Sequence, residues 1–213
     1  MRIFAVTMTL VGVVTLCADE RASGQSASSS ATSADRKNAD DKFSVGDPAP
    51  AFEGLVGTDD KKHSLEEFKE AKAVALVFTC NQCPVAKAYE DRLNALQEDY
   101  ADKDVQVVAI NVNNAEAEKL PAMKERAEEK GFEFPYLSDP TQKVGRDYGA
   151  KVTPHVFLLD AKRNLVFVGP VDDSMDERKV KRKYLREAVD AVLAGKKPEA
   201  AEVKPFGCGI AYE

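Results

Sequence analysis

The stretch FTCNQCPVAKAYEDR, residues 78–92, places two cysteines two residues apart, Cys80 and Cys83. It overlaps the end of AVALVFT (73–79), a short apolar run without alternation, which is typical of a strand buried on both faces. From Cys83 onward, apolar residues recur at spacings of four and three, which predicts an amphipathic helix. The two cysteines are therefore expected at a turn between a buried strand and the start of a helix.

The remaining pattern predicts an α/β domain. VQVVAINV (105–112) is expected to be a second buried strand, and HVFLLD (155–160) and LVFVG (165–169) a hairpin. The early strand–helix–strand unit requires a parallel pair with a crossover, whereas the hairpin requires an antiparallel pair. A mixed central β-sheet flanked by helices on both faces satisfies both requirements. Further helices are expected at 121–130, after Asp139-Pro140, and from a capping box at Ser174 and Glu177.

The composition limits the classes of function. Of the 213 residues, 44% are hydrophobic and 31% are charged, as in soluble globular proteins. The net charge of −6 argues against a general nucleic-acid binder, so no nucleic-acid partner is expected. The basic stretch KVKRKYLR (179–186) is offset by nearby acidic residues and is expected on the solvated face of a helix. The sequence leaves the oligomeric state open.

Residues 1–24 are expected to be a signal peptide. A positive charge precedes an apolar run too short to span a bilayer, and Ala22 and Gly24 offer small residues for cleavage. Export to the periplasm or the extracellular space follows, with membrane contact only if this segment is retained. The alternatives are a lipoprotein modified at Cys17 and an uncleaved membrane anchor. Leu16 disfavours the lipoprotein, because that position ordinarily carries a small side chain, and the short run disfavours the anchor.

Three parts follow the expected signal peptide. Residues 25–42 are rich in Ser, Ala and Asp without apolar periodicity, and they predict a flexible linker. Residues 43–195 contain all the expected helices and strands and are interpreted as one domain. Residues 196–213 form a tail in which no periodicity is recognised, but which carries Cys208 between two glycines.

The cysteine count favours redox chemistry. If Cys17 leaves with the signal peptide, the mature chain keeps Cys80, Cys83 and Cys208, and an odd number leaves one thiol outside any pair. A helix N-terminus favours an anionic thiolate, which is the nucleophile of disulfide exchange. Cys80, the outer cysteine, is therefore expected to attack, and Cys83 to resolve the mixed disulfide. Cys208 is a candidate third thiol: a resolving cysteine, a metal ligand, or a bystander in an ordered tail.

Thr153 and Pro154 stand directly before the strand expected at 155–160. A C-x-x-C at a strand-to-helix turn, followed by Thr-Pro before a hairpin, resembles the thioredoxin fold. In that family the proline is cis and packs against the active-site cysteines. The resemblance therefore implies a cis Pro154 and a peptide-binding role for the backbone of Thr153. Thr79, directly before Cys80, is a second candidate for substrate binding.

More closely, the chain resembles the redoxin branch, the peroxiredoxin-like AhpC/TSA group. The resemblance covers residues 43–195 and implies an antioxidant thiol protein that needs no organic cofactor. Its electrons would be exchanged with a redox partner protein or a thiol substrate. The segments that agree in order and spacing are GDPAPAFEGL (46–55), SLEEF (64–68), FTCNQCP (78–84) and FPYLSDPTQKVGRDYGAKVTPHVFLLD (134–160).

The chain departs from the peroxidase pattern of that branch. If Cys83-Pro84 aligns with the Cys-Pro of peroxiredoxins, then Cys80 stands where those enzymes have a Thr, and Leu76 where they have a Pro. Both family residues help to position peroxide. Arg146 is a candidate for the active-site Arg of that family. The chain also departs from thioredoxin itself, since the strand before the cysteines contains no acidic residue.

The expected function is an exported thiol–disulfide oxidoreductase that works through a Cys80–Cys83 dithiol/disulfide. One alternative is a thiol peroxidase with Cys83 as the peroxidatic cysteine. Another is a copper(I)-binding or delivery protein using Cys80, Cys83 and His155, because two thiolates and an imidazole suit Cu(I). Apart from this copper alternative no metal is expected, because structural zinc needs four ligands and the sequence has no second C-x-x-C. His63 lies in a polar turn and is expected at the surface. In a third alternative the Cys80–Cys83 disulfide stays permanently oxidised, and the protein is a non-catalytic module that binds extended peptides.

Overall fold

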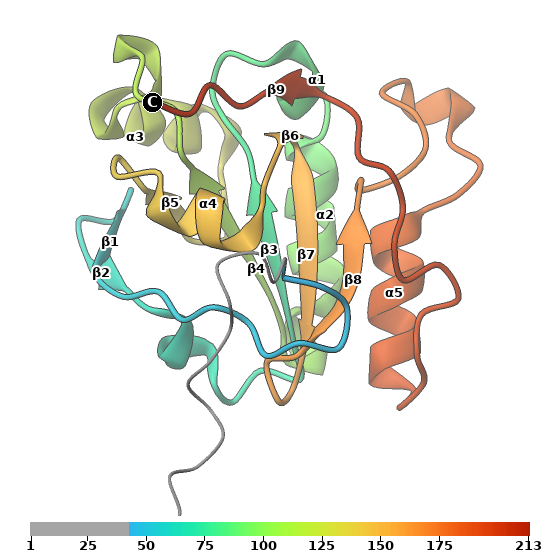
Figure 1. Ribbon diagram of the computed structural model, residues 1–213. Helices are drawn as coiled ribbons and strands as arrows, with labels where there is room; N and C mark the ends of the chain where they lie inside the picture. The colour runs from blue at the N-terminus through green and yellow to red at the C-terminus, as the bar shows by residue number, and fades with distance from the viewer. Residues whose placement is uncertain (1–42) are drawn as a thin grey trace, which may run out of the picture. The chain divides into compact units, whose positions relative to one another are not determined.

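A mixed β-sheet forms the centre of the computed structural model, which describes residues 43–213 (Figure 1). The expected signal peptide and linker lie outside the described residues. Within these residues seven strands pair in the order β2-β1-β5-β4-β3-β7-β8. The strands are β1 (Leu55–Gly57), β2 (Lys62–His63), β3 (Ala73–Phe78), β4 (Val105–Asn111), β5 (Tyr136–Ser138), β7 (His155–Asp160) and β8 (Leu165–Gly169).

The middle of the sheet follows the predicted pattern. The strands β3 and β4 pair in parallel, with Phe78 opposite Ile110, and β3 pairs antiparallel with β7, with Phe78 opposite His155. All six residues of β3 are buried, because helices cover both faces of the sheet here. The hairpin of β7 and β8 is antiparallel, as predicted. The chain therefore leaves β3 toward the cysteines from the most deeply buried part of the sheet.

Two apolar cores lie on opposite faces of the sheet. One face packs against α2 (Glu90–Tyr100), α3 (Leu120–Lys130) and α5 (Tyr184–Leu193). The other face packs against α4 (Lys143–Tyr148) and the 3-10 helix η1 (Leu65–Phe68). This arrangement confirms the predicted mixed sheet with helices on both faces, and the fold is thioredoxin-like. Among residues 43–213, no helix has the length and apolar character needed to cross a membrane.

Three expected helices begin or run differently in the structure. The helix predicted from Cys83 is interrupted near Tyr89, which gives α1 (Pro84–Lys87) before α2. Asp139 does not start a helix at the next residue; its carboxylate accepts hydrogen bonds from the amides of Val144 and Gly145, inside α4. The predicted capping box at Ser174 and Glu177 is wrong, because Ser174 Oγ bonds to the backbone of Asp176 instead.

The basic stretch 179–186 consequently lies mostly before a helix and not on its face. Only a short 3-10 helix, η4 (Glu177–Lys179), forms near Glu177, and α5 begins at Tyr184. Two further 3-10 helices were not predicted, η2 (Ala101–Lys103) and η3 (Glu116–Glu118). The second of these supplies a residue to the site described below.

A second small sheet was not predicted. It pairs β6 (Val152–Thr153) with β9 (Cys208–Gly209), which lies in the C-terminal tail. The tail runs back over the end of the domain, so that β9 lies beside β6 and α1 in Figure 1. No strand is expected from the sequence of this tail. The small sheet brings the third cysteine to the first two.

Candidate active site

The two cysteines of the C-x-x-C motif lie where β3 gives way to α1. Cys83 is the N-cap residue of α1, and its Sγ accepts a hydrogen bond from the backbone amide of Ala86 at 3.4 Å. Cys80 and Cys83 are each only 5% exposed, so neither sulfur is openly available to solvent. The local sequence explains the turn, because Pro84 suits the first position of a helix and has no amide hydrogen to satisfy.

Thr153 contacts both cysteines. Its Oγ1 lies 3.2 Å from the Sγ of Cys80, and its carbonyl oxygen lies 3.3 Å from the Sγ of Cys83. The Thr153–Pro154 peptide bond is cis, as the resemblance to thioredoxin implied. The two cysteines therefore both contact Thr153, whose backbone is the strip expected to pair with a peptide.

The disulfide in the structure joins Cys83 to Cys208, with Cα atoms 6.0 Å apart, and Cys80 is a free buried thiol. The expected Cys80–Cys83 disulfide is therefore not the one present. The physical reason lies in the small sheet: Thr153 is opposite Cys208 in the register of β6 and β9. Because Thr153 also contacts Cys83, the tail delivers its cysteine directly to the second cysteine of the motif.

Residues 206–212 form a strap across this end of the domain. Their exposure alternates with a period of two, so that every second side chain is turned toward the protein. The strap is bound by its backbone as well, since the amide of Ile210 donates to the carbonyl of Lys151 at 3.0 Å. The inward side chains are Phe206, Cys208, Ile210 and Tyr212.

A buried carboxylate holds the loop between the two cysteines. Glu118, in η3, accepts hydrogen bonds from the backbone amides of Asn81 at 2.7 Å and Gln82 at 2.9 Å. It also accepts one from the side-chain amide of Asn111 at 2.9 Å, and the hydroxyl of Tyr136 donates to Asn81 Oδ1 at 2.9 Å. The sequence does not indicate this network, because an acidic residue in a polar segment after β4 belongs to no recognisable motif.

The surroundings of Cys80 disfavour its thiolate. Burial is the main cause that raises the pKa of the Cys80 thiol above its ordinary value. The hydrogen bond with Thr153 acts in the opposite direction, whereas the negative charge of Glu118 raises the pKa further. The backbone amides of Cys83 and Gln82 lower it, but they do not reverse the net direction. Cys80 is thus a protonated thiol at neutral pH that must lose its proton to attack.

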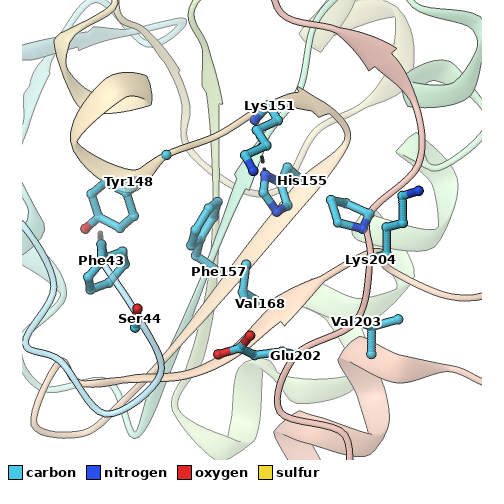
Figure 2. A pocket seen from close by; sticks show the side chains of 12 residues that line it. Phe43, Ser44, Tyr148, Lys151, His155, Phe157, Val168, Glu202, Val203 and Lys204 are labelled. Carbon is cyan, nitrogen blue, oxygen red and sulfur yellow. Dashed lines mark hydrogen bonds between the residues drawn. The ribbon is translucent and has the colours of Figure 1, made fainter. Parts of the chain in front are cut away.

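His155 lines a cavity of about 340 Å³ beside the site (Figure 2). The ring accepts a hydrogen bond at Nδ1 from the amide of Lys151 and packs against Phe157, with ring centroids 4.5 Å apart. Its Nε2 has no hydrogen-bond partner among residues 43–213. Burial is the main cause that lowers the pKa of His155 to about 4, and the charge of Lys151 adds to the effect. Across the cavity lie Glu202 and the tail residues that follow it.

The structure does not bring together the residues expected for a copper site. Within the part of the chain that the structure describes, no group of three or more His, Cys, Asp or Glu residues is placed to hold a metal ion. His155 lies in the cavity, and Cys83 is bonded to Cys208. The expectation that His63 lies at the surface is wrong: it is buried, and its ring contacts the carboxylates of Asp59 and Glu67.

The two remaining candidate residues, Thr79 and Arg146, contact the backbone of β4 and the C-terminal tail, respectively. Thr79 is buried, and its amide donates to the carbonyl of Ile110 at 2.9 Å, so it extends the pairing of β3 with β4 up to the cysteines. Arg146 is engaged with the tail, since its guanidinium lies over the ring of Tyr212 and bonds to the carbonyl oxygen of Glu213. Arg146 therefore holds the C-terminal tail in place.

Two cysteines at the start of a helix, facing a cis-proline strip, place this chain in the thioredoxin-like class of proteins. The chain belongs to the Redoxin family, whose sequence model matches residues 44–184. The thiol–disulfide oxidoreductase ResA of Bacillus thuringiensis (strain Al Hakam) is 28% identical over 126 residues, which are 59% of this chain and 69% of that protein.

Two solved structures are similar over most of this chain. An uncharacterized conserved protein from Geobacillus kaustophilus is 36% identical with a TM-score of 0.75, and the match covers 80% of this chain and 93% of that one. A hypothetical protein from Sinorhizobium meliloti 1021 is 35% identical with a TM-score of 0.75, covering 81% of this chain and 97% of that one. Both matches extend beyond the residues that the family model covers.

Proposed function

We propose that this chain is an exported thiol–disulfide oxidoreductase that exchanges electrons through Cys80 and Cys83 with a redox partner protein or a small thiol. The observation that carries this proposal is that both sulfur atoms lie within 3.3 Å of oxygens of one residue, Thr153. Because Thr153 precedes the cis Pro154, an extended peptide that pairs with this strip would place its own sulfur beside both cysteines. The similarity to a named thiol–disulfide oxidoreductase supports the same class.

The exchange starts from the fully reduced chain. The thiolate of Cys80 attacks one sulfur of the partner disulfide, the partner S–S bond breaks, and the other partner sulfur leaves as a thiolate. Cys83, once deprotonated, attacks the sulfur of Cys80, which forms the Cys80–Cys83 bond and releases the second partner thiolate. Two electrons pass to the partner, and the two protons lost by the cysteines end on the partner thiols. The reverse sequence oxidises a partner dithiol.

The neighbouring residues position this chemistry. Thr153 donates or accepts a hydrogen bond at the sulfur of Cys80 and offers its backbone to a partner, while cis Pro154 fixes the direction of that backbone. Glu118 fixes the loop between the cysteines through the amides of Asn81 and Gln82. Thr79 anchors the end of β3 from which Cys80 projects.

Export is proposed on the sequence of residues 1–24, with their short apolar run and small residues before the linker. An oxidising compartment is consistent with a chain in which a disulfide and a free thiol lie side by side. Edman sequencing or intact mass of the protein recovered from the producing cell tests this proposal. A mature N-terminus near residue 25 is expected, and recovery of the uncleaved chain in the cytoplasm would overturn it.

A trapping experiment tests the roles of the two cysteines. In the Cys83→Ser/Cys208→Ser chain, the mixed disulfide between Cys80 and a disulfide substrate such as insulin cannot be resolved, so it should accumulate and be seen by mass spectrometry. The matched Cys80→Ser/Cys208→Ser chain should trap at least tenfold less. The assignment of Cys80 as the nucleophile is wrong if the second chain traps more substrate than the first.

A thiol peroxidase is the second candidate, and the Cys83–Cys208 disulfide favours it. The thiolate of Cys83 would attack peroxide, the O–O bond would break, and Cys83 would become a sulfenic acid. The released hydroxide would take up the proton that the Cys83 thiol had lost and leave as water. The thiol of Cys208 would then condense with the sulfenic acid to form the disulfide and release a second water. Rapid alkylation of the reduced chain after addition of hydrogen peroxide separates the candidates. Oxidation of Cys83 far faster than that of an ordinary cysteine supports the peroxidase, and an ordinary rate leaves disulfide exchange.

A further inference from the structure

The strap occupies the strip on which the proposed exchange depends. In the register of β6 and β9, Val152 is opposite Gly209 and Thr153 is opposite Cys208. The backbone edge that would pair with a partner peptide is therefore already paired with the chain itself. An extended segment of another protein cannot pair with the same edge while the strap is in place.

The strap is built to fit this position closely. A Cβ atom added to Gly207 would lie 2.1 Å from the carbonyl oxygen of Thr153, so only glycine allows the backbones to approach in this way. A Cβ atom on Gly209, two residues further along, would have nothing within 4 Å. The two glycines that flank Cys208 thus differ: one is required by the contact and the other is not.

Side chains on both sides of the cysteine add to the contact. The ring of Phe206 packs edge-on against Tyr89, with centroids 6.3 Å apart. Beyond the cysteine, the hydroxyl of Tyr212 donates to the carbonyl of Ala150 at 2.8 Å. A Cβ atom on Gly145 would lie 2.7 Å from that hydroxyl, so the domain surface is shaped to receive Tyr212. The strap therefore binds through several residues and not through its disulfide alone.

We propose that Cys208 is a third catalytic thiol, which takes over the disulfide from the Cys80–Cys83 pair and, by docking the strap on Thr153, closes the partner-binding strip. The proposal rests on the proposed function, because it uses the disulfide that this function forms. The thiolate of Cys208 attacks the sulfur of Cys83, the Cys80–Cys83 bond breaks, and the Cys83–Cys208 bond forms. Cys80 leaves as a thiolate and takes up the proton that Cys208 gave up. No electrons are gained or lost, so no oxidant is required.

The chain therefore has two oxidised forms, which differ in how firmly the strap is held on Thr153. With the disulfide at Cys80–Cys83, the strap is held by noncovalent contacts and a partner can compete for Thr153. With the disulfide at Cys83–Cys208, a covalent bond holds the strap directly at the strip and raises its effective concentration there, so a partner must displace a tightly tethered segment. The structure is the closed form, with Cys80 as the thiol that can reverse the step.

The difference between the two glycines provides the test. The full-length chain and its Gly207→Ala and Gly209→Ala variants are equilibrated in glutathione redox buffer, quenched with acid, alkylated and mapped for disulfides by mass spectrometry. We expect Cys83–Cys208 to be the main oxidised isomer in the unmodified chain and in Gly209→Ala. In Gly207→Ala, the ratio of Cys83–Cys208 to Cys80–Cys83 should fall at least tenfold. An unchanged ratio in Gly207→Ala, or Cys80–Cys83 as the main isomer of the unmodified chain, would overturn the proposal.

A second measurement uses the unmodified chain and does not depend on how a variant folds. Hydrogen exchange of the strap is compared in the oxidised and the reduced protein. The amide of Ile210, which donates to Lys151, should exchange at least tenfold faster after reduction, because the strap then opens. Equal protection of the Ile210 amide in the oxidised and the reduced protein would overturn the proposal, because the strip would then stay closed with or without the disulfide.

Failure of this proposal can be told from failure of the proposed function. Reduction of insulin by the fully reduced chain reports on Cys80 and Cys83 and begins before any disulfide reaches Cys208. If the unmodified chain reduces insulin but its disulfide ratio does not respond to Gly207→Ala, only the role of the strap is wrong. If the unmodified chain reduces no disulfide, the proposed function itself is wrong.

Discussion

The carboxylate of Glu118 accepts a hydrogen bond of 2.7 Å from the backbone amide of Asn81, inside the loop between the two cysteines of the motif. The backbone amide of Gln82 donates to the same carboxylate, so two amides of the turn point toward a negative charge. Helix N-terminal amides ordinarily stabilise a cysteine thiolate. Here a negative side chain lies beside them, and it acts on Cys80 in the opposite direction.

Glu118→Gln should lower the pKa of Cys80, because the substitution removes a negative charge that raises it. We expect the pKa of Cys80 to decrease, and the free energy of unfolding to fall by about 1–3 kcal/mol, since one buried amide loses its acceptor. The pH dependence of Cys80 alkylation by iodoacetamide, followed on the Cys80 peptide by mass spectrometry, measures the pKa. Glu116→Gln is the matched control, because the Glu116 side chain is 87% exposed. Equal pKa values in both variants would contradict this role of Glu118.

Thr153→Val should shift the pKa of Cys80 in the opposite direction. Valine keeps the branched shape of threonine but removes the Oγ1 that lies 3.2 Å from the Cys80 sulfur, a hydrogen bond that lowers this pKa. The thiolate fraction falls tenfold for each unit of pKa, so alkylation of Cys80 at pH 7 should slow by up to about tenfold. Thr153→Ser, which keeps the hydroxyl, should retain most of the rate. A faster reaction in the valine variant would show that the hydrogen bond does not favour the thiolate.

His155 should make the stability of the domain depend on pH below neutrality. Its pKa is about 4 in the folded chain because of burial and Lys151, against an ordinary value of 6.5. Between these two pH values the unfolded state therefore binds more protons than the folded state. The free energy of unfolding is fully retained above pH 6.5 and decreases as the pH falls toward 4. The free energy of unfolding should decrease by roughly 2–3 kcal/mol more in the unmodified chain than in His155→Phe between pH 7 and 4.5. Denaturant unfolding at both pH values checks this, and parallel losses in the two proteins would be the contrary result.

Burial decided which parts of the site could be predicted from the sequence. The spacing of Cys80 and Cys83 after an apolar run, with Thr-Pro before a hairpin, was enough to predict the fold. The resemblance to thioredoxin implied that Pro154 is cis and packs against the cysteines. Glu118 could not be predicted, because it stands two residues from Glu116 in the same polar segment. In the folded chain Glu118 is 4% exposed, whereas Glu116 lies on the surface. This difference in burial cannot be read from the sequence of the segment.

The pairing of Cys83 with Cys208 was only one of the alternatives that the sequence left open for Cys208, and the reason is different. The strap carries a period-two pattern at Phe206, Cys208, Ile210 and Tyr212, and that pattern is a strand signal. The two glycines that flank the cysteine obscured it, since glycine weakens a strand. In the structure, Gly207 is present because the strap approaches Thr153 closely. A glycine that argues against a strand in isolation is thus required by the tertiary contact.

The most direct test of the central claim is the reduction of insulin by the mature chain with dithiothreitol as the electron source, compared with its Cys80→Ser variant. We predict that the unmodified chain accelerates insulin reduction well above the rate with dithiothreitol alone, and that Cys80→Ser returns the rate to that background. Full activity in Cys80→Ser would contradict the claim that Cys80 begins the exchange.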